Sequence, residues 1–348
     1  MKVLKLNKTT RRNYLTYALV ILAYAILQIL GSTGSLSSSL KGMLVPICAY
    51  VVMAVSLNLT VGVLGELSLG HAGFMSVGAF SGVTAAMALQ EVISSAPLRL
   101  ALGMAVGALL AAVVGFLIGI PVLRLNGDYL AIVTLAFGEI IKSIFNNLYV
   151  GIDAGGLHMS LLSDNTDLAD GGKLIIGGPM GIGGIQKIST FTAGFLLVMV
   201  SLVVVFNLVN SRAGRAIMSI RDNRIAAESI GLNVTKYKMM AFVTSAALAG
   251  AAGALFAMNY STIVASKFDF NTSILVLVFV VLGGLGNMLG SIIAAALLTI
   301  LPEALRSFAD YRMLVYAIVL ILVMLATNSP TLKNFFGRFK PSHGKEAV

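Results

Sequence analysis

The chain has 348 residues, of which 58% are hydrophobic and 11% are charged, and its formal net charge is +10. Soluble domains carry about 25% charged residues, so this composition, with a mean hydropathy of +0.95, excludes a soluble protein and indicates an integral membrane protein. The positive charge does not indicate nucleic-acid binding, because the basic residues lie at the ends of apolar segments, where anionic lipid headgroups attract them.

Ten apolar segments are candidates to cross a bilayer, which takes about 20 residues, although 271–285 and 288–305 are each short. We expect all of them to be helical, because lipid offers the backbone no hydrogen-bond partners and no alternating pattern of barrel strands occurs. The predicted spans are 14–30, 43–64, 68–90, 99–121, 128–149, 191–209, 239–260, 271–285, 288–305 and 310–327. The fold class is therefore an all-α polytopic membrane protein with about ten transmembrane helices. A glycine-rich break leaves open whether 271–305 is one bent helix or two short ones.

Most of the 24 basic residues fall on alternate connections, the pattern of cytoplasmic loops and tails. This orientation places both termini in the cytoplasm, with basic tails at 1–13 and 331–348 around a single membrane domain, 14–330. It places the loop 150–190 outside and the loop 210–238 in the cytoplasm. We interpret the first apolar run as a retained span, because no small-residue cleavage pattern follows it.

The segment from Ser56 to Phe80 contains Ser68 and the more strongly polar Asn58, Glu66 and His71, together with closely spaced glycines. Such glycines allow close helix packing, or local unwinding that exposes the backbone to a substrate. Both interpretations stay open for Gly62, Gly65, Gly70, Gly73, Gly78 and Gly82, and for Gly250 and Gly253. The three more strongly polar residues are candidates for a translocation path, and solvation at the membrane surface is the alternative for Glu66 and His71.

Glu139 is a candidate for a functional group within the membrane. It lies eleven residues into its predicted span, about 16 Å along the helix axis, where a carboxylate is costly unless it is paired or solvated. We expect it to face the interior of the bundle, either along the path with Thr134 nearby or hydrogen-bonded for packing alone. Lys142, three residues later, is expected to extend outward to the membrane surface.

The external loop 150–190 is rich in glycine and has no strong periodic pattern. A loop of this length is usually functional or mobile. It predicts a docking site for an external partner, with Asp164, Asp167 and Asp170 supplying charge, or a lid over the entrance; a plain tether is the alternative.

The cytoplasmic loop 210–238 predicts a short helix. Asp222 and Asn223 suit its start, residues 224–230 form two turns, and Gly231 suits a left-handed end. An apolar face ringed by charge is typical of a helix that docks in a partner's groove; its predicted members are Ile225, Ala226, Ala227 and Ile230, ringed by Arg221, Arg224 and Glu228. The alternative is an ordinary helix at the membrane surface.

The sequence contains no enzyme motif. It has no GxxxxGK[ST] loop for nucleotide phosphates, no HExxH and no GxSxG, and its single cysteine, Cys48, excludes a disulfide or a cysteine metal site. We therefore predict no catalytic residues, no metal and no cofactor in this chain. If nucleotide energises transport, another polypeptide binds the ATP.

Three segments, in order along the chain, resemble one family. They are SLNLTVGVLGELSLGHAGFMSVGAF at 56–80, DYLAIVTLAFGEIIKSIFNN at 128–147 and RDNRIAAESIGLNVTKYKMMAFVTSAALAGAAGAL at 221–255. They resemble the permeases of branched-chain amino acid ABC transporters of the LivM type, over about residues 40–327. Two positions depart from the family's pattern: Glu66 stands where glutamine is expected, and Phe80 where tyrosine is common.

The resemblance implies a type II ABC importer-like permease in the bacterial inner membrane. Its implied partners are two P-loop ATPase subunits, a second, LivH-like permease subunit and an extracytoplasmic substrate-binding protein. The predicted ATPase-coupling residues are Arg221, Asp222, Asn223, Arg224, Ala226, Ala227, Glu228 and Gly231, and the predicted path residues are Asn58, Glu66, His71, Thr134 and Glu139. The transported solute, and whether the second permease is a paralogue or a copy, stay open. The alternative function is an ion-coupled secondary transporter or channel.

Overall fold

The structure, a computed structural model, describes residues 8–34, 37–90, 92–125, 127–153, 156–161 and 173–305, together with 314, 317, 318 and 321. The chain divides into two compact units, residues 1–296 and 297–348. The first holds the features discussed below, and the described part of the second is mainly the end of one helix. Of the predicted N-terminal tail only residues 8–13 are described, and of the predicted span 310–327 only residues 314, 317, 318 and 321. The predicted C-terminal tail lies outside the described residues.

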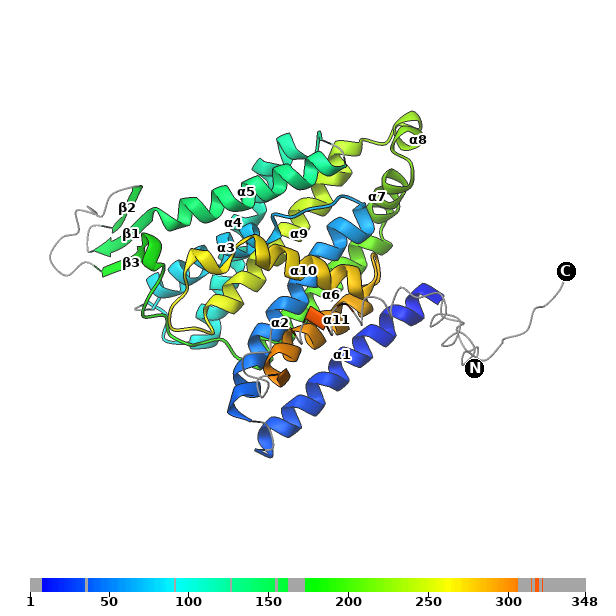
Figure 1. The fold of residues 1–348 in the computed structure, drawn as a ribbon. Helices are drawn as coiled ribbons and strands as arrows, with labels where there is room; N and C mark the ends of the chain where they lie inside the picture. The colour runs from blue at the N-terminus through cyan, green and yellow to red at the C-terminus, as the bar shows by residue number, and fades with distance from the viewer. Residues whose placement is uncertain are drawn as a thin grey trace. The chain divides into compact units, whose positions relative to one another are not determined.

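Helices account for most of the described chain (Figure 1). They are α1 (Lys8–Ser32), α2 (Ser38–Asn58), α3 (His71–Ala88), α4 (Ala96–Val122), α5 (Asp128–Asn146), α6 (Phe191–Asn210), α7 (Arg212–Asp222), α8 (Arg224–Ser229), α9 (Val234–Ala257), α10 (Phe270–Gly283) and α11 (Met288–Ala304). A π-helical segment, η1 (Leu59–Leu64), continues α2. Among the described residues, six helices are long and apolar enough to cross a membrane. They lie in Asn13–Ser32, Ser38–Leu64, Ala96–Val122, Phe191–Asn210, Val234–Ala257 and Ala265–Gly283.

The predicted segment 271–305 forms two helices rather than one bent helix. α10 ends at Gly283 and α11 begins at Met288. Between them Gly284 and Gly286 have φ angles of 91° and 77°, in the left-handed half of backbone space that glycine enters without steric cost. The glycines thus make a tight turn, here called the α10–α11 turn (residues 284–287).

The core lies around α2, α3 and α9. In the span formed by α2 and η1, 89% of the most apolar stretch of residues is buried, and in α9 the buried share is 72%. In α1, which packs on α6, it is only 6%. Glycines allow the central helices to touch: a Cβ added at Gly78 would lie 2.0 Å from the Gly250 carbonyl oxygen, and one at Gly253 would lie 2.0 Å from that of Met75. The packing interpretation of these glycines is therefore confirmed.

The loop 150–190, which was predicted to be external, contains a small sheet that the prediction of an all-α fold missed. Strands β1 (Leu148–Asp153), β2 (Gly156–Leu161) and β3 (Lys173–Gly177) pair antiparallel in the order β2-β1-β3. The prediction of a helix to residue 149 was also wrong, because α5 ends at Asn146 and β1 follows. The 3-10 turn η2 (Gly178–Met180) comes next, and Ile182 then pairs with Ile263 near the start of η3 (Ala265–Lys267). Asp164, Asp167 and Asp170 lie outside the described residues.

Candidate functional site at the helix break

The chain leaves the α-helical path between α2 and α3. The break consists of η1 and residues 65–70, which are not helical. Gly65 ends η1 with φ 81°, and its N–H and that of Glu66 both bond to the Thr60 carbonyl. π-helical turns within α-helices occur often at functional sites. Apolar helices cannot satisfy the freed backbone groups, so polar side chains from other helices must do so.

Asn58 ties the start of the break to the α10–α11 turn. Its side chain is fully buried; Nδ2 donates to Ser291 Oγ at 2.9 Å, and Oδ1 accepts from the Gly286 N–H at 2.8 Å. A Cβ added at Gly62 would lie 2.2 Å from the Gly286 nitrogen, so the two backbones are in direct contact. Both hydrogen-bonding ends of Asn58 are thus used within the protein.

His71 begins α3 and is buried. Its Nε2 lies 2.7 Å from Ser56 Oγ, and that hydroxyl lies 2.9 Å from the Met53 carbonyl, to which it donates. Because the hydroxyl proton is directed to Met53, the Ser56 oxygen is available to accept from an imidazole that carries its proton on Nε2. Ser245 on α9 donates to the Ser56 carbonyl at 2.6 Å. His71 is therefore held within the protein rather than solvated at the membrane surface.

Two hydroxyls receive the backbone N–H groups where the chain enters α3. Thr134 Oγ1 on α5 accepts from Leu69 N–H at 3.0 Å, and Ser273 Oγ on α10 accepts from Ala72 N–H at 3.1 Å. Thr134, predicted as a path residue near Glu139, is buried and bonds to the break. Sequence reasoning missed the serines Ser56, Ser245, Ser273 and Ser291, although small polar residues within apolar helices often mark contacts between helices.

Glu66 forms a buried ion pair with Lys238 of α9. The Lys238 side chain is 3% exposed and the Glu66 side chain 13%, so both charges are removed from water and each depends on the other. The alternative that Glu66 is simply solvated at the membrane surface is wrong. Lys238, which was assigned only to a cytoplasmic loop, belongs instead to the buried part of the site.

Glu139 lies apart from the break. Its carboxylate pairs with Lys142 one turn along α5, and the Glu139 side chain is 38% exposed. Lys142 was expected to extend outward to the membrane surface, which stays a prediction; the structure adds that its charge is paired with the Glu139 carboxylate. Glu139 was expected to face the bundle interior or the path; it does not lie in the interior of this chain taken alone, and a position along the path stays a prediction. The pair stays on a partly open face of α5.

The short helix predicted in the loop 210–238 forms as α8 (Arg224–Ser229). The Asn223 side chain accepts from Ala226 N–H at 3.0 Å and caps it, while Gly231 follows with φ 85°. Asp222 does not cap the helix, because its carboxylate bonds to the Arg221 side chain at 3.0 Å. Arg224 and Glu228 form an exposed ion pair along α8 at 2.9 Å.

The predicted apolar face of α8 needs one correction. Ile225 and Ile230 are 80% and 75% exposed, but Ala227 is 2% exposed and packs with Ile220 and Val234. Ala227 faces inward because α8 packs through this residue against Ile220 of α7 and Val234 of α9. The exposed apolar groups are thus two isoleucines and Ala226, on a helix at the end of the bundle opposite the small sheet (Figure 1).

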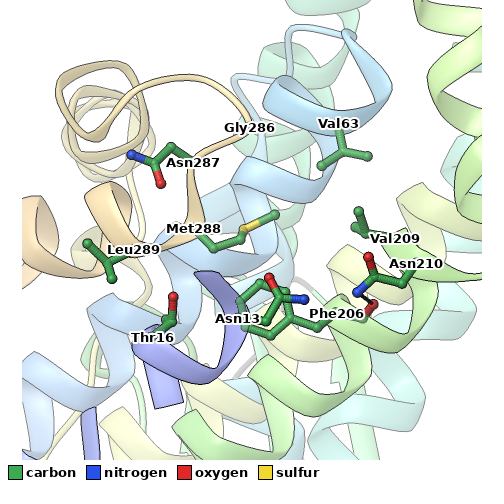
Figure 2. A pocket seen from close by; sticks show the side chains of 10 residues that line it. All are labelled: Asn13, Thr16, Val63, Phe206, Val209, Asn210, Gly286, Asn287, Met288 and Leu289. Carbon is green, nitrogen blue, oxygen red and sulfur yellow. Dashed lines mark hydrogen bonds between the residues drawn. The ribbon is translucent and has the colours of Figure 1, made fainter. Parts of the chain in front are cut away.

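A cavity of about 40 Å³ borders η1. Figure 2 shows amide side chains from three separate elements around it: Asn13 of α1, Asn210 of α6 and Asn287 of the α10–α11 turn. Val63, Phe206 and Met288 supply apolar walls. One water needs roughly 10–15 Å³ by this measure, so the cavity has room for a few waters and is too small for an amino acid.

We expect the Asn58→Leu variant to be markedly less stable. Leucine fills a similar volume but leaves the partly buried Gly286 N–H and the buried Ser291 hydroxyl without Asn58, at a cost of about 1–3 kcal/mol for an unsatisfied group. The measurement is the thermal unfolding midpoint in detergent. Asn147→Leu is the control, because Asn147 is exposed and its side chain donates to the Ser143 carbonyl one turn earlier in α5. Equal midpoints for the two variants would contradict the bridging role of Asn58.

No group of three or more His, Cys, Asp or Glu side chains within the described part of the chain is placed to hold a metal ion. The site is a junction of hydrogen bonds and one ion pair between helices, with a capped helix beside it. Such an arrangement suits the transmission of movement between helices.

Comparison with known proteins matches this chain to membrane transport components. The family model described as "Branched-chain amino acid transport system / permease component" matches residues 39–324. The LivM permease protein of the high-affinity branched-chain amino acid transport system of Salmonella typhimurium is 34% identical over 329 residues, covering 92% of this chain and 74% of that protein. The Escherichia coli protein of the same name is 36% identical, covering 79% and 66%.

More distant similarity extends to permeases for other solutes. The fructose import permease protein FruG of Bifidobacterium longum is 25% identical, covering 72% of this chain and 73% of that protein. No solved structure gives a significant match.

Proposed function

Because the chain belongs to the family of branched-chain amino acid transport permeases, we propose that it is the transmembrane permease subunit of an ATP-driven importer for leucine, isoleucine, valine or related neutral amino acids. The observation that carries this proposal is the family match over residues 39–324. The solute class follows the relatives of higher identity, at 34% and 36%, rather than the fructose permease at 25%.

The ATP would be hydrolysed by two separate P-loop ATPase subunits, and α8 would be the docking site that this chain offers to them. In support, α8 is capped at its start by Asn223, anchored through Ala227 and presents Ile225 and Ile230 to the surroundings. Exposed isoleucines on a fixed helix suit insertion into a groove of a partner. A second permease subunit would complete the path, and Glu139, on the partly open face of α5, would face that path in the complex.

The membrane part would have about ten helices of the type II importer kind, in a bacterial inner membrane with both termini in the cytoplasm. The distribution of basic residues supports this orientation. It places the sheet β2-β1-β3 outside, where it would receive an extracytoplasmic substrate-binding protein. Met159 and Met180, at 65% and 83% exposed, are apolar groups available for that contact.

The test is purification of the tagged chain from its native membrane in mild detergent, followed by reconstitution. We expect two P-loop ATPases and a second permease to co-purify, and leucine uptake into proteoliposomes to require ATP and the binding protein. Recovery of the chain alone, with leucine uptake continuing in ATP-depleted vesicles, would instead establish an ion-coupled transporter.

A further inference from the structure

Two basic side chains connect the flanks of α8 to the helix break. Arg221, the penultimate residue of α7, donates from Nη1 to the Gly62 carbonyl of η1 at 3.0 Å. Lys238, in the first turns of α9, pairs with Glu66 just after η1. The chain from Arg221 to Lys238, which carries α8, is therefore fastened at both ends to the segment 62–66.

The contact at Lys238 is a buried ion pair, and the contact at Arg221 is a close packing of its side chain on the backbone. Separating the partners of a buried ion pair leaves uncompensated charges and is strongly destabilising, so the Glu66–Lys238 contact resists being pulled apart. At the other end, a Cβ added at Gly65 would lie 2.5 Å from Arg221 Cγ. The Arg221 side chain therefore rests directly on the backbone that it bonds to.

The segment that receives these contacts is suited to movement. It is π-helical and ends in a left-handed glycine, and on its other side Val63 borders the cavity of Figure 2. Its neighbour across that cavity is the α10–α11 turn, to which Asn58 and Gly62 connect it. A displacement at α8 thus has a continuous route of polar and backbone contacts to a turn between two helices.

We propose that Glu66, Lys238 and Arg221 are positioning residues that transmit movement of α8 to η1 and from there to the α10–α11 turn. This inference rests on the proposed function. It assigns Glu66 to energy coupling rather than to contact with the solute. The route requires no catalytic group in this chain; it requires that the ion pair hold η1 to α9 while the helices shift.

The test compares the assembled importer in proteoliposomes with variants of the pair. Glu66→Met/Lys238→Met removes both charges while retaining similar volume, a replacement that is often neutral or stabilising for a buried pair. We expect ATPase binding and the thermal midpoint to be retained, while leucine imported per ATP hydrolysed falls about fivefold or more. The exchanged pair Glu66→Lys/Lys238→Glu should recover most of that ratio.

Lys236→Met is the matched control, since it removes an exposed charge from the same helix two residues away and should leave the ratio unchanged. A double-methionine variant that imports leucine at the wild-type ratio would overturn the inference, while ATP-driven uptake by the wild type would still support the proposed function. A parallel loss of folded complex with an unchanged ratio would also overturn it, since the pair would then serve stability alone. Failure of wild-type uptake would overturn both proposals.

Discussion

Gly78→Ala should prevent most of the protein from accumulating in a folded form, although it adds a single methyl group. The added Cβ would lie 2.0 Å from the Gly250 carbonyl oxygen and 2.3 Å from the Gly250 Cα. These are backbone atoms that cannot rotate away, so α3 and α9 would have to separate along the most buried part of the molecule. Glycine to alanine favours an isolated helix by only about 1 kcal/mol, while we expect lost core packing to cost about 4 kcal/mol or more.

Gly42→Ala provides the matched control for this prediction. Gly42 also lies within a helix, α2, but a Cβ there meets nothing within 4 Å. Its replacement should leave stability unchanged or raise it by up to about 1 kcal/mol. The measurement is the yield of monodisperse protein in detergent together with its thermal midpoint. A Gly78→Ala protein with the wild-type midpoint would contradict the close crossing of α3 and α9.

Local features of this chain could be predicted from the sequence because their causes are local. Hydropathy placed most of the helices, and Asn223 and Gly231 marked the ends of α8 because capping depends on a few adjacent residues. The inward orientation of Ala227 was missed because a two-turn helix offers too few residues to show which side faces its neighbours. Only the contacts with Ile220 and Val234 decide it.

Features that depend on distant residues could not be predicted. Glu66 and Lys238 are 172 residues apart in the sequence. Each lies near the end of an apolar segment, where a charged residue is normally explained by solvation at the membrane surface. Asn58 likewise finds its partners more than two hundred residues later. The small sheet was missed because its strands have five or six residues each, too short for a clear alternating pattern, and β3 pairs only after a long connection.

Ile225→Asp/Ile230→Asp should abolish ATP-driven uptake while leaving the permease inserted and folded. Both side chains are mostly exposed in this chain, so their replacement costs the isolated protein little. If they insert into the ATPases, burial of the two is worth about 3 kcal/mol or more, and a loss of that size weakens binding by about a hundredfold. The measurement is ATPase co-purification with the tagged chain, read beside leucine uptake.

The double aspartate is a sharper test than deletion of residues 226–231, because deletion would also remove Ala227 from its buried contact with Ile220 and Val234. Ile225→Leu/Ile230→Leu keeps apolar volume at both positions and should retain ATPase binding. Glu228→Arg, which breaks the pair with Arg224 and reverses a charge beside the isoleucines, should impair uptake as well. If the double-aspartate protein binds the ATPases as tightly as wild type, the ATPases dock elsewhere and α8 is an ordinary helix at the membrane surface.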